Sequence, residues 1–131
     1  NILESDVILI GVSRTSKTPT SIYLANRGYK TINIPLVLDQ KIPESLSNNS
    51  ACIVGLVADP ERLADIRRNR VAIMNDHNLK EYTDLDSIKK EVNESKNIFK
   101  RNNWPIIDVT RRSVEETAAS ILKIIEIKKH K

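Results

Sequence analysis

Cysteine and aromatic residues are scarce in this chain. Its single cysteine, Cys52, lies in the apolar run CIVGLV and cannot form an internal disulfide, which is typical of a buried thiol in the reducing cytoplasm. Aromatic residues make up only 4% of the chain, and the basic residues behind the net charge of +4 fall in several separate places. Because nucleic-acid binding needs a basic stripe or stacking platforms, we expect no nucleic-acid partner and keep that function only as a weak alternative.

The chain also lacks an apolar stretch of the roughly 18 residues that cross a membrane, so we expect no membrane partner. Its 131 residues are 40% hydrophobic and 29% charged, which predicts one domain, residues 1–131, with one core. The first residue is Asn1 rather than methionine, and we expect this domain to be a piece of a longer protein. His77 and His130 have no further ligand at zinc-site spacing, so a zinc site is not predicted.

Short apolar runs alternate with amphipathic stretches along the chain. The apolar runs predict strands at 6–11, 30–38, 51–58 and 106–109, the second of which Pro35 must end, bulge or push to a sheet edge. Helices are predicted at 18–27, from Asp59 through ERLADIRRNR, at 84–102, and after Ser113, which forms a capping box with Glu116. This alternation predicts an α/β layered fold, with a mainly parallel sheet of about four strands flanked by helices.

The stretch GVSRTSKT lies between the first predicted strand and helix. It matches the nucleotide-binding pattern G-x-x-x-x-G-K-[ST] except that Ser16 replaces the second glycine. Ser16 must therefore tolerate a Cβ atom in a left-handed conformation or adopt different backbone angles. The pattern assigns phosphate binding to eight residues, of which Lys17 bridges the phosphates and Thr18 is placed for a metal ion: Gly11, Val12, Ser13, Arg14, Thr15, Ser16, Lys17 and Thr18. The alternative is a strand, a turn and a helix with a chance lysine.

Further candidates follow the third and fourth predicted strands, where ligands of open α/β sheets gather. Asp59 is the preferred general base and equally a helix N-cap, with Asp39 and Asp108 in reserve. The next helix carries several arginines, and Arg62, Arg67 and Arg70 are candidates for contact with phosphate or substrate. The alternative for these arginines is a solvated helical face.

Four stretches together resemble one known family: GVSRTSKTPTSIYLA, NIPLV, VGLVADPERLADIRRNR and IDVTRRSVEETAASIL. They are similar to the pyruvate, phosphate dikinase regulatory proteins and their phosphoenolpyruvate synthase counterparts, over most of the chain from Asp6 to about Leu122. In this family Ser16 and the TPTS that follows Lys17 are typical. The resemblance implies a P-loop kinase-like fold and the C-terminal, nucleotide-binding part of a two-domain protein.

The resemblance also implies a bifunctional cytoplasmic enzyme. With ADP as phosphoryl donor it phosphorylates a threonine of the dikinase or synthase and switches it off, leaving AMP. With inorganic phosphate it removes that phosphate and releases pyrophosphate. Carried over to this chain, residues 11–18 hold the ADP phosphates, with Lys17 catalytic and Thr18 placed for Mg²⁺. The target, the catalytic base, the metal requirement and the oligomeric state, a homodimer included, stay open.

Two other functions remain alternatives on the sequence. One is a noncatalytic domain that binds a nucleotide or senses phosphate. The other is a P-loop kinase for a small metabolite, because such enzymes also combine this loop with an arginine-rich helix and a capped last helix.

Overall fold

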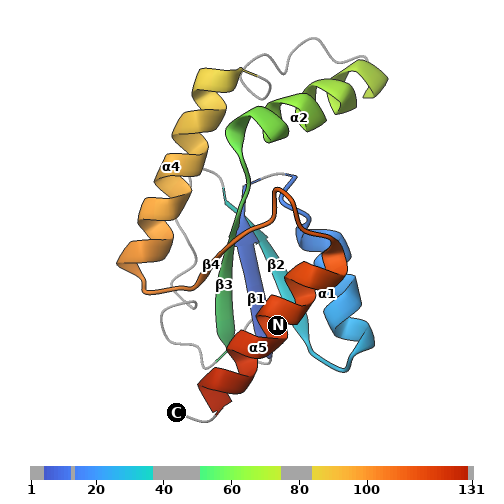
Figure 1. Cartoon of the computed structure of the whole chain (residues 1–131), viewed down its shortest axis with the longest axis vertical. Coiled ribbons are helices and arrows are strands. Elements are labelled where there is room, and N and C mark those ends of the chain that lie inside the picture. The colour runs from blue at the N-terminus through green and yellow to red at the C-terminus, as the bar shows by residue number, and fades with distance from the viewer. Residues whose placement is uncertain (1–4, 13, 37–50, 75–83, 130–131) are drawn as a thin grey trace.

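A four-stranded sheet with helices on both faces forms the fold (Figure 1). The computed structural model describes residues 5–12, 14–36, 51–74 and 84–129. The strands lie in the order β2-β1-β3-β4, and each neighbouring pair is parallel: β1 (Val7–Gly11), β2 (Thr31–Pro35), β3 (Cys52–Val57) and β4 (Ile106–Asp108). The predicted α/β fold with a four-stranded parallel sheet is thereby confirmed.

Two pairs of helices cover the sheet. On one side α1 (Lys17–Asn26) contacts α5 (Val114–Lys129), and α2 (Pro60–Met74) contacts α4 (Leu85–Arg101). Figure 1 shows α1 beside α5 on one side of the sheet, α4 along the opposite side, and α2 next to the upper end of α4. The chain steps from β1 to β2 in one direction and from β3 to β4 in the other, so right-handed crossovers place α1 and the α2–α4 pair on opposite faces. The direction reverses between β1 and β3, and ligands of such sheets bind at the carboxyl ends of the strands there.

Burial of the strands follows from their place in the sheet. All residues of β1 and β3 are buried, because both strands are central and covered on both faces. Strand β2 is only half-buried and lies at the edge of the sheet, where the proline at its end, Pro35, is tolerated. Phe99 of α4 packs on Gly55 of β3, where any Cβ atom would collide with the ring. The lone thiol of Cys52 is buried and free, as predicted.

Capping residues are present at the starts of α4 and α5. Asp84 caps α4 by accepting a hydrogen bond from the backbone N–H of Ser87. The predicted capping box before α5 is present, since Ser113 Oγ accepts from the N–H of Glu116 and the Glu116 carboxylate accepts from the N–H of Ser113. The second strand is shorter than predicted, 31–35 instead of 30–38, and residues 37–38 lie outside the described part. None of the described helices is long and apolar enough to cross a membrane.

Candidate phosphate-binding site

The stretch from Gly11 to Thr18, here called the 11–18 segment, joins the carboxyl end of β1 to the first turn of α1. Gly11 pairs with Pro35 at the end of β2, and Asp59 follows β3 on the other side of β1. The segment therefore lies at the reversal point of the sheet, where the topology places a ligand site. Seven of its eight residues are described, and Ser13 lies outside the described residues.

Two residues of the segment other than glycine adopt left-handed backbone conformations. Arg14 has φ 71°, and Ser16 has φ 61° and ψ 25°. Side chains make this conformation unfavourable by about 1–2 kcal/mol per residue. Of the two alternatives predicted for Ser16, the first therefore holds: the position keeps the left-handed backbone that glycine would favour and accommodates a Cβ atom.

The absence of a side chain at Gly11 leaves room for two nearby oxygen atoms. A Cβ atom at Gly11 would lie 2.6 Å from the carbonyl oxygen of Leu56 in β3 and 3.0 Å from Thr15 Oγ1. The first contact involves backbone that cannot move without disturbing the centre of the sheet. The glycine at the start of the motif is thus required by close packing.

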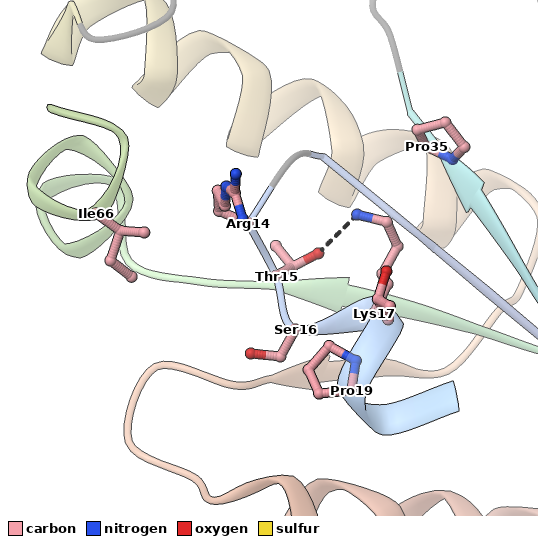
Figure 2. Close-up of a pocket in the computed structure, with 8 residues that line it drawn as sticks. Arg14, Thr15, Ser16, Lys17, Pro19, Pro35 and Ile66 are labelled. Carbon is pink, nitrogen blue, oxygen red and sulfur yellow. Dashed lines mark hydrogen bonds between the residues drawn. The ribbon is translucent and has the colours of Figure 1, made fainter. Parts of the chain in front are cut away.

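The side chain of Lys17 is turned inward, and only 9% of the residue is exposed. Its Nζ donates hydrogen bonds to the backbone carbonyl of Val12 at 2.7 Å and to Thr15 Oγ1 at 3.2 Å (Figure 2). The Thr15 hydroxyl in turn donates to the same Val12 carbonyl at 2.9 Å. Together these three groups hold the lysine amino group against the backbone of the 11–18 segment.

The electrostatic surroundings of Lys17 are positive. Burial, followed by the charges of Arg67 and Arg14, lowers the pKa of Lys17 from 10.5 to about 8. Each of these three effects disfavours the ammonium form. An anion placed beside Lys17 would act in the opposite direction and favour the ammonium form.

An open pocket of about 420 Å³ borders the segment (Figure 2). It is lined by Arg14, Thr15, Ser16, Lys17, Thr18, Pro19, Pro35 and Ile66. The first backbone N–H groups of a helix have no acceptors within the helix and attract anions, and the first turn of α1 carries no acidic residue. The arrangement suits phosphate oxygens. The hydroxyl-bearing Thr18 lines the same pocket and could contribute one oxygen ligand to a phosphate-bound Mg²⁺, although the described residues contain no acidic or histidine cluster for a metal.

The arginines of α2 lie in different environments. Arg62 is exposed at the start of the helix, whereas Arg67 is fully buried and forms an ion pair with Glu91 of α4 at 2.6 Å. Arg70 lies within α2, but its side chain falls outside the described residues. The predicted contacts of these three arginines with phosphate stay predictions. In the ligand-free site, Arg67 acts on Lys17 through its charge.

Asp59 lines a second pocket at the same edge of the sheet, of about 780 Å³, with Asp108, Thr110 and the start of α5. Its carboxylate accepts a hydrogen bond from the N–H of Arg62 at 3.1 Å, so its predicted role as an N-cap is confirmed. Thr110 Oγ1 accepts from the N–H of Asp59 at 2.7 Å and donates to Asp108 at 2.5 Å. Two of the three carboxylates considered as bases thus lie together, and Asp39 lies outside the described residues.

The motif did not identify four residues that belong to the site or support it. The pocket of Lys17 is also lined by Pro19, Pro35 and Ile66, and Glu91 forms an ion pair with Arg67. Pro35 could have been found, because parallel pairing with the first strand brings the end of the second strand beside the motif. No local signal in the sequence connects Glu91 with this site.

Comparison with known proteins gives one consistent result. The family model described as kinase/pyrophosphorylase matches residues 1–122. A protein of Pelagibacter ubique, named as a pyruvate, phosphate dikinase regulatory protein, is 60% identical over 129 residues, which are 97% of this chain and 47% of the relative. Proteins with the same name from Erythrobacter litoralis and a Chelativorans species are 52% and 51% identical, over 92% and 95% of this chain. The chain covers 44% and 46% of those two relatives, so it spans less than half of their length.

Proposed function

This chain belongs to the kinase/pyrophosphorylase family, and we propose that it is the nucleotide-binding part of a bifunctional regulatory enzyme. The enzyme transfers the β-phosphoryl group of ADP to a threonine hydroxyl of pyruvate, phosphate dikinase, or of phosphoenolpyruvate synthase, and thereby inactivates its target. The regulatory-protein names of its relatives support the dikinase as the target. The buried free thiol of Cys52 agrees with a reaction in the cytoplasm.

In the forward direction, the threonine oxygen forms a bond to the β-phosphorus of ADP, the bond between the α,β-bridging oxygen and that phosphorus breaks, and AMP leaves. The hydroxyl proton passes to a general base. In the reverse direction, an oxygen of inorganic phosphate forms a bond to the phosphorus of the phosphothreonine, and the bond between that phosphorus and the threonine oxygen breaks. The threonine oxygen takes up a proton, and pyrophosphate and the free hydroxyl are the products. Both directions move one phosphoryl group between oxygens, so the protein must mainly position the reactants and balance negative charge.

The observation that carries the proposal is the inward amino group of Lys17 beside an open pocket. Lys17 balances charge as the β-phosphoryl group moves, and the first turn of α1 and the 11–18 segment bind the phosphate oxygens. Arg14 lines the same pocket and adds a positive charge for ADP or for inorganic phosphate. Thr18 contributes an oxygen ligand where Mg²⁺ accompanies the nucleotide.

Asp59 is the general base in this proposal, with Asp108 and Asp39 in reserve. Its position directly after β3 supports the role, because the carboxyl ends of β1 and β3 are neighbours in the sheet. Target threonine bound at the Asp59 pocket would meet ADP bound at the Lys17 pocket along this edge. Arg62 lies exposed in the first turn of α2, where its N–H donates to Asp59, and its side chain is available to the incoming phosphate.

One observation favours a second function, a domain that binds a nucleotide without transferring phosphate. Asp59 and Lys17 line different pockets. If Asp59 is too far from the nucleotide to act as a base, the domain would still bind ADP but would not transfer its phosphoryl group. Such a domain would report the ADP level to its partner by binding alone.

The test is to incubate the protein with active dikinase and ADP, and then to add inorganic phosphate. The proposal expects ADP-dependent loss of dikinase activity with release of AMP, followed by recovery with release of pyrophosphate. ATP in place of ADP is the matched control. Binding of ADP without phosphorylation of the target, in a protein of the relatives' full length, would support the second function and exclude the first.

A further inference from the structure

Thr15 occupies an unusual place within the 11–18 segment. It lies between the two left-handed residues, Arg14 and Ser16, and is fully buried. Figure 2 shows its hydroxyl directed at the amino group of Lys17, while the side chain of Arg14 points away from that amino group. The phosphate-binding pattern does not require a threonine here, because it leaves the residue before its second glycine unspecified.

The Thr15 hydroxyl joins the two other polar groups of the segment. It donates to the Val12 carbonyl at 2.9 Å and accepts from Lys17 Nζ at 3.2 Å, and Lys17 Nζ also donates to the Val12 carbonyl at 2.7 Å. A lysine ammonium has three donors. Two of them are used by these bonds within the segment, so the direction of the third is set. Because Lys17 lines the pocket, that third N–H is the one left for a ligand.

We propose that Thr15 is a positioning residue that acts through Lys17, and that its hydroxyl fixes the lysine amino group for a phosphate oxygen in the pocket. The inference rests on the proposed function for the identity of the ligand. Gly11 is part of the same arrangement, because a Cβ atom there would lie 3.0 Å from Thr15 Oγ1. Without the hydroxyl, the flexible lysine side chain would have only the Val12 carbonyl to hold it.

The test compares Thr15→Val, which keeps the shape and removes the hydroxyl, with Thr15→Ser, which keeps the hydroxyl. Thr20→Val is the matched control, because Thr20 is also fully buried in α1 and its hydroxyl has no hydrogen-bond partner among the described residues. Affinities for ADP and for inorganic pyrophosphate are measured by calorimetry. The rate of reductive methylation of Lys17 at one fixed pH is followed by mass spectrometry, without ligand.

We expect Thr15→Val to bind both probes about tenfold more weakly, as loss of one hydrogen bond to a charged group implies. Its Lys17 should be methylated faster, because the amino group is then held only by the Val12 carbonyl. Thr15→Ser and Thr20→Val should resemble the unaltered protein in both measurements. Thr15→Ala takes the place of Thr15→Val if thermal unfolding shows that the valine variant does not fold.

An unchanged methylation rate and unchanged affinities in Thr15→Val would overturn the role of Thr15 and leave the proposed function in place. If the unaltered protein binds neither ADP nor pyrophosphate, the proposed function fails instead. In that case the ligand-free methylation rates still decide whether Thr15 holds the amino group of Lys17: a faster rate in Thr15→Val alone supports it, and an unchanged rate excludes it.

Discussion

Arg67 of α2 donates a hydrogen bond of 2.6 Å to the carboxylate of Glu91 in α4, and this ion pair ties the two helices together. The arginine is fully buried, whereas the glutamate side chain is 28% exposed. The charge of Arg67 also lowers the pKa of Lys17. Helix α4, which contributes no residue to the pocket of Lys17, is thereby linked to the electrostatics of the candidate site.

Removing the carboxylate of this pair should destabilise the fold. Glu91→Gln removes a carboxylate paired with the buried guanidinium, and breaking a fully buried pair costs about 3–5 kcal/mol. Because Glu91 is partly exposed, we expect a loss of about 2 kcal/mol in the free energy of unfolding, measured by urea denaturation. Asp65→Asn is the control, because Asp65 pairs with Arg68 at 3.8 Å on an exposed surface and should change stability by less than about 0.5 kcal/mol. Equal effects of the two substitutions would contradict this account.

Gly11→Ala should be more damaging than Gly28→Ala. The new methyl group at position 11 would lie 2.6 Å from the Leu56 carbonyl, and such overpacking against a central strand costs about 3 kcal/mol. Gly28 has open space around it but a φ of +91°, so alanine there costs only about 1 kcal/mol of backbone strain. Urea denaturation measures both, and a Gly28→Ala variant that is the less stable of the two would refute the prediction.

The left-handed backbone at Ser16 predicts opposite results for two substitutions. Ser16→Gly should keep ADP binding and stay within about 1 kcal/mol of the original stability, since relief of strain and the added entropy of the unfolded chain nearly cancel. Ser16→Val should lose more than about 1 kcal/mol and bind ADP poorly, because β-branched residues rarely adopt positive φ. Denaturation and calorimetry check both variants. Full stability and binding in Ser16→Val would show that the segment does not need this conformation.

Binding of ADP should weaken above about pH 8. The pKa of Lys17 in the free protein is about 8, and a bound phosphate raises it, so binding above that pH requires uptake of a proton. Below it the amino group is already charged and affinity should be nearly constant on this account, whereas above it affinity should fall by up to about tenfold per pH unit.

The control for this pH dependence is Lys17→Met, which keeps much of the apolar stem and removes the charge. It should bind ADP weakly and with little dependence on pH between about 8 and 9.5. Calorimetric titrations across this interval provide the measurement. A decline of the same slope in Lys17→Met would assign the effect to another group.

Much of the fold was predictable because it follows from local patterns. Apolar runs such as 7–11 and 52–57 are typical of strands covered on both faces, and capping residues such as Ser113 mark helix starts independently of distant contacts. The length of the second strand was predicted less well. Its apolar pattern runs to Leu38, but the strand ends at Pro35, because the partner strand β1 ends at Gly11, which pairs with Pro35.

The candidate site was likewise predictable only in part. The sequence alone determined the 11–18 segment and its place between a strand and a helix, because motif and periodicity are properties of neighbouring residues. Which charges act on Lys17 was decided only by the tertiary structure. The arginines of α2 look alike along the chain, yet packing buries Arg67 against Glu91, 24 residues away, and leaves Arg62 exposed. Burial and counter-charge depend on which helices meet across the sheet, and only the folded chain brings those helices together.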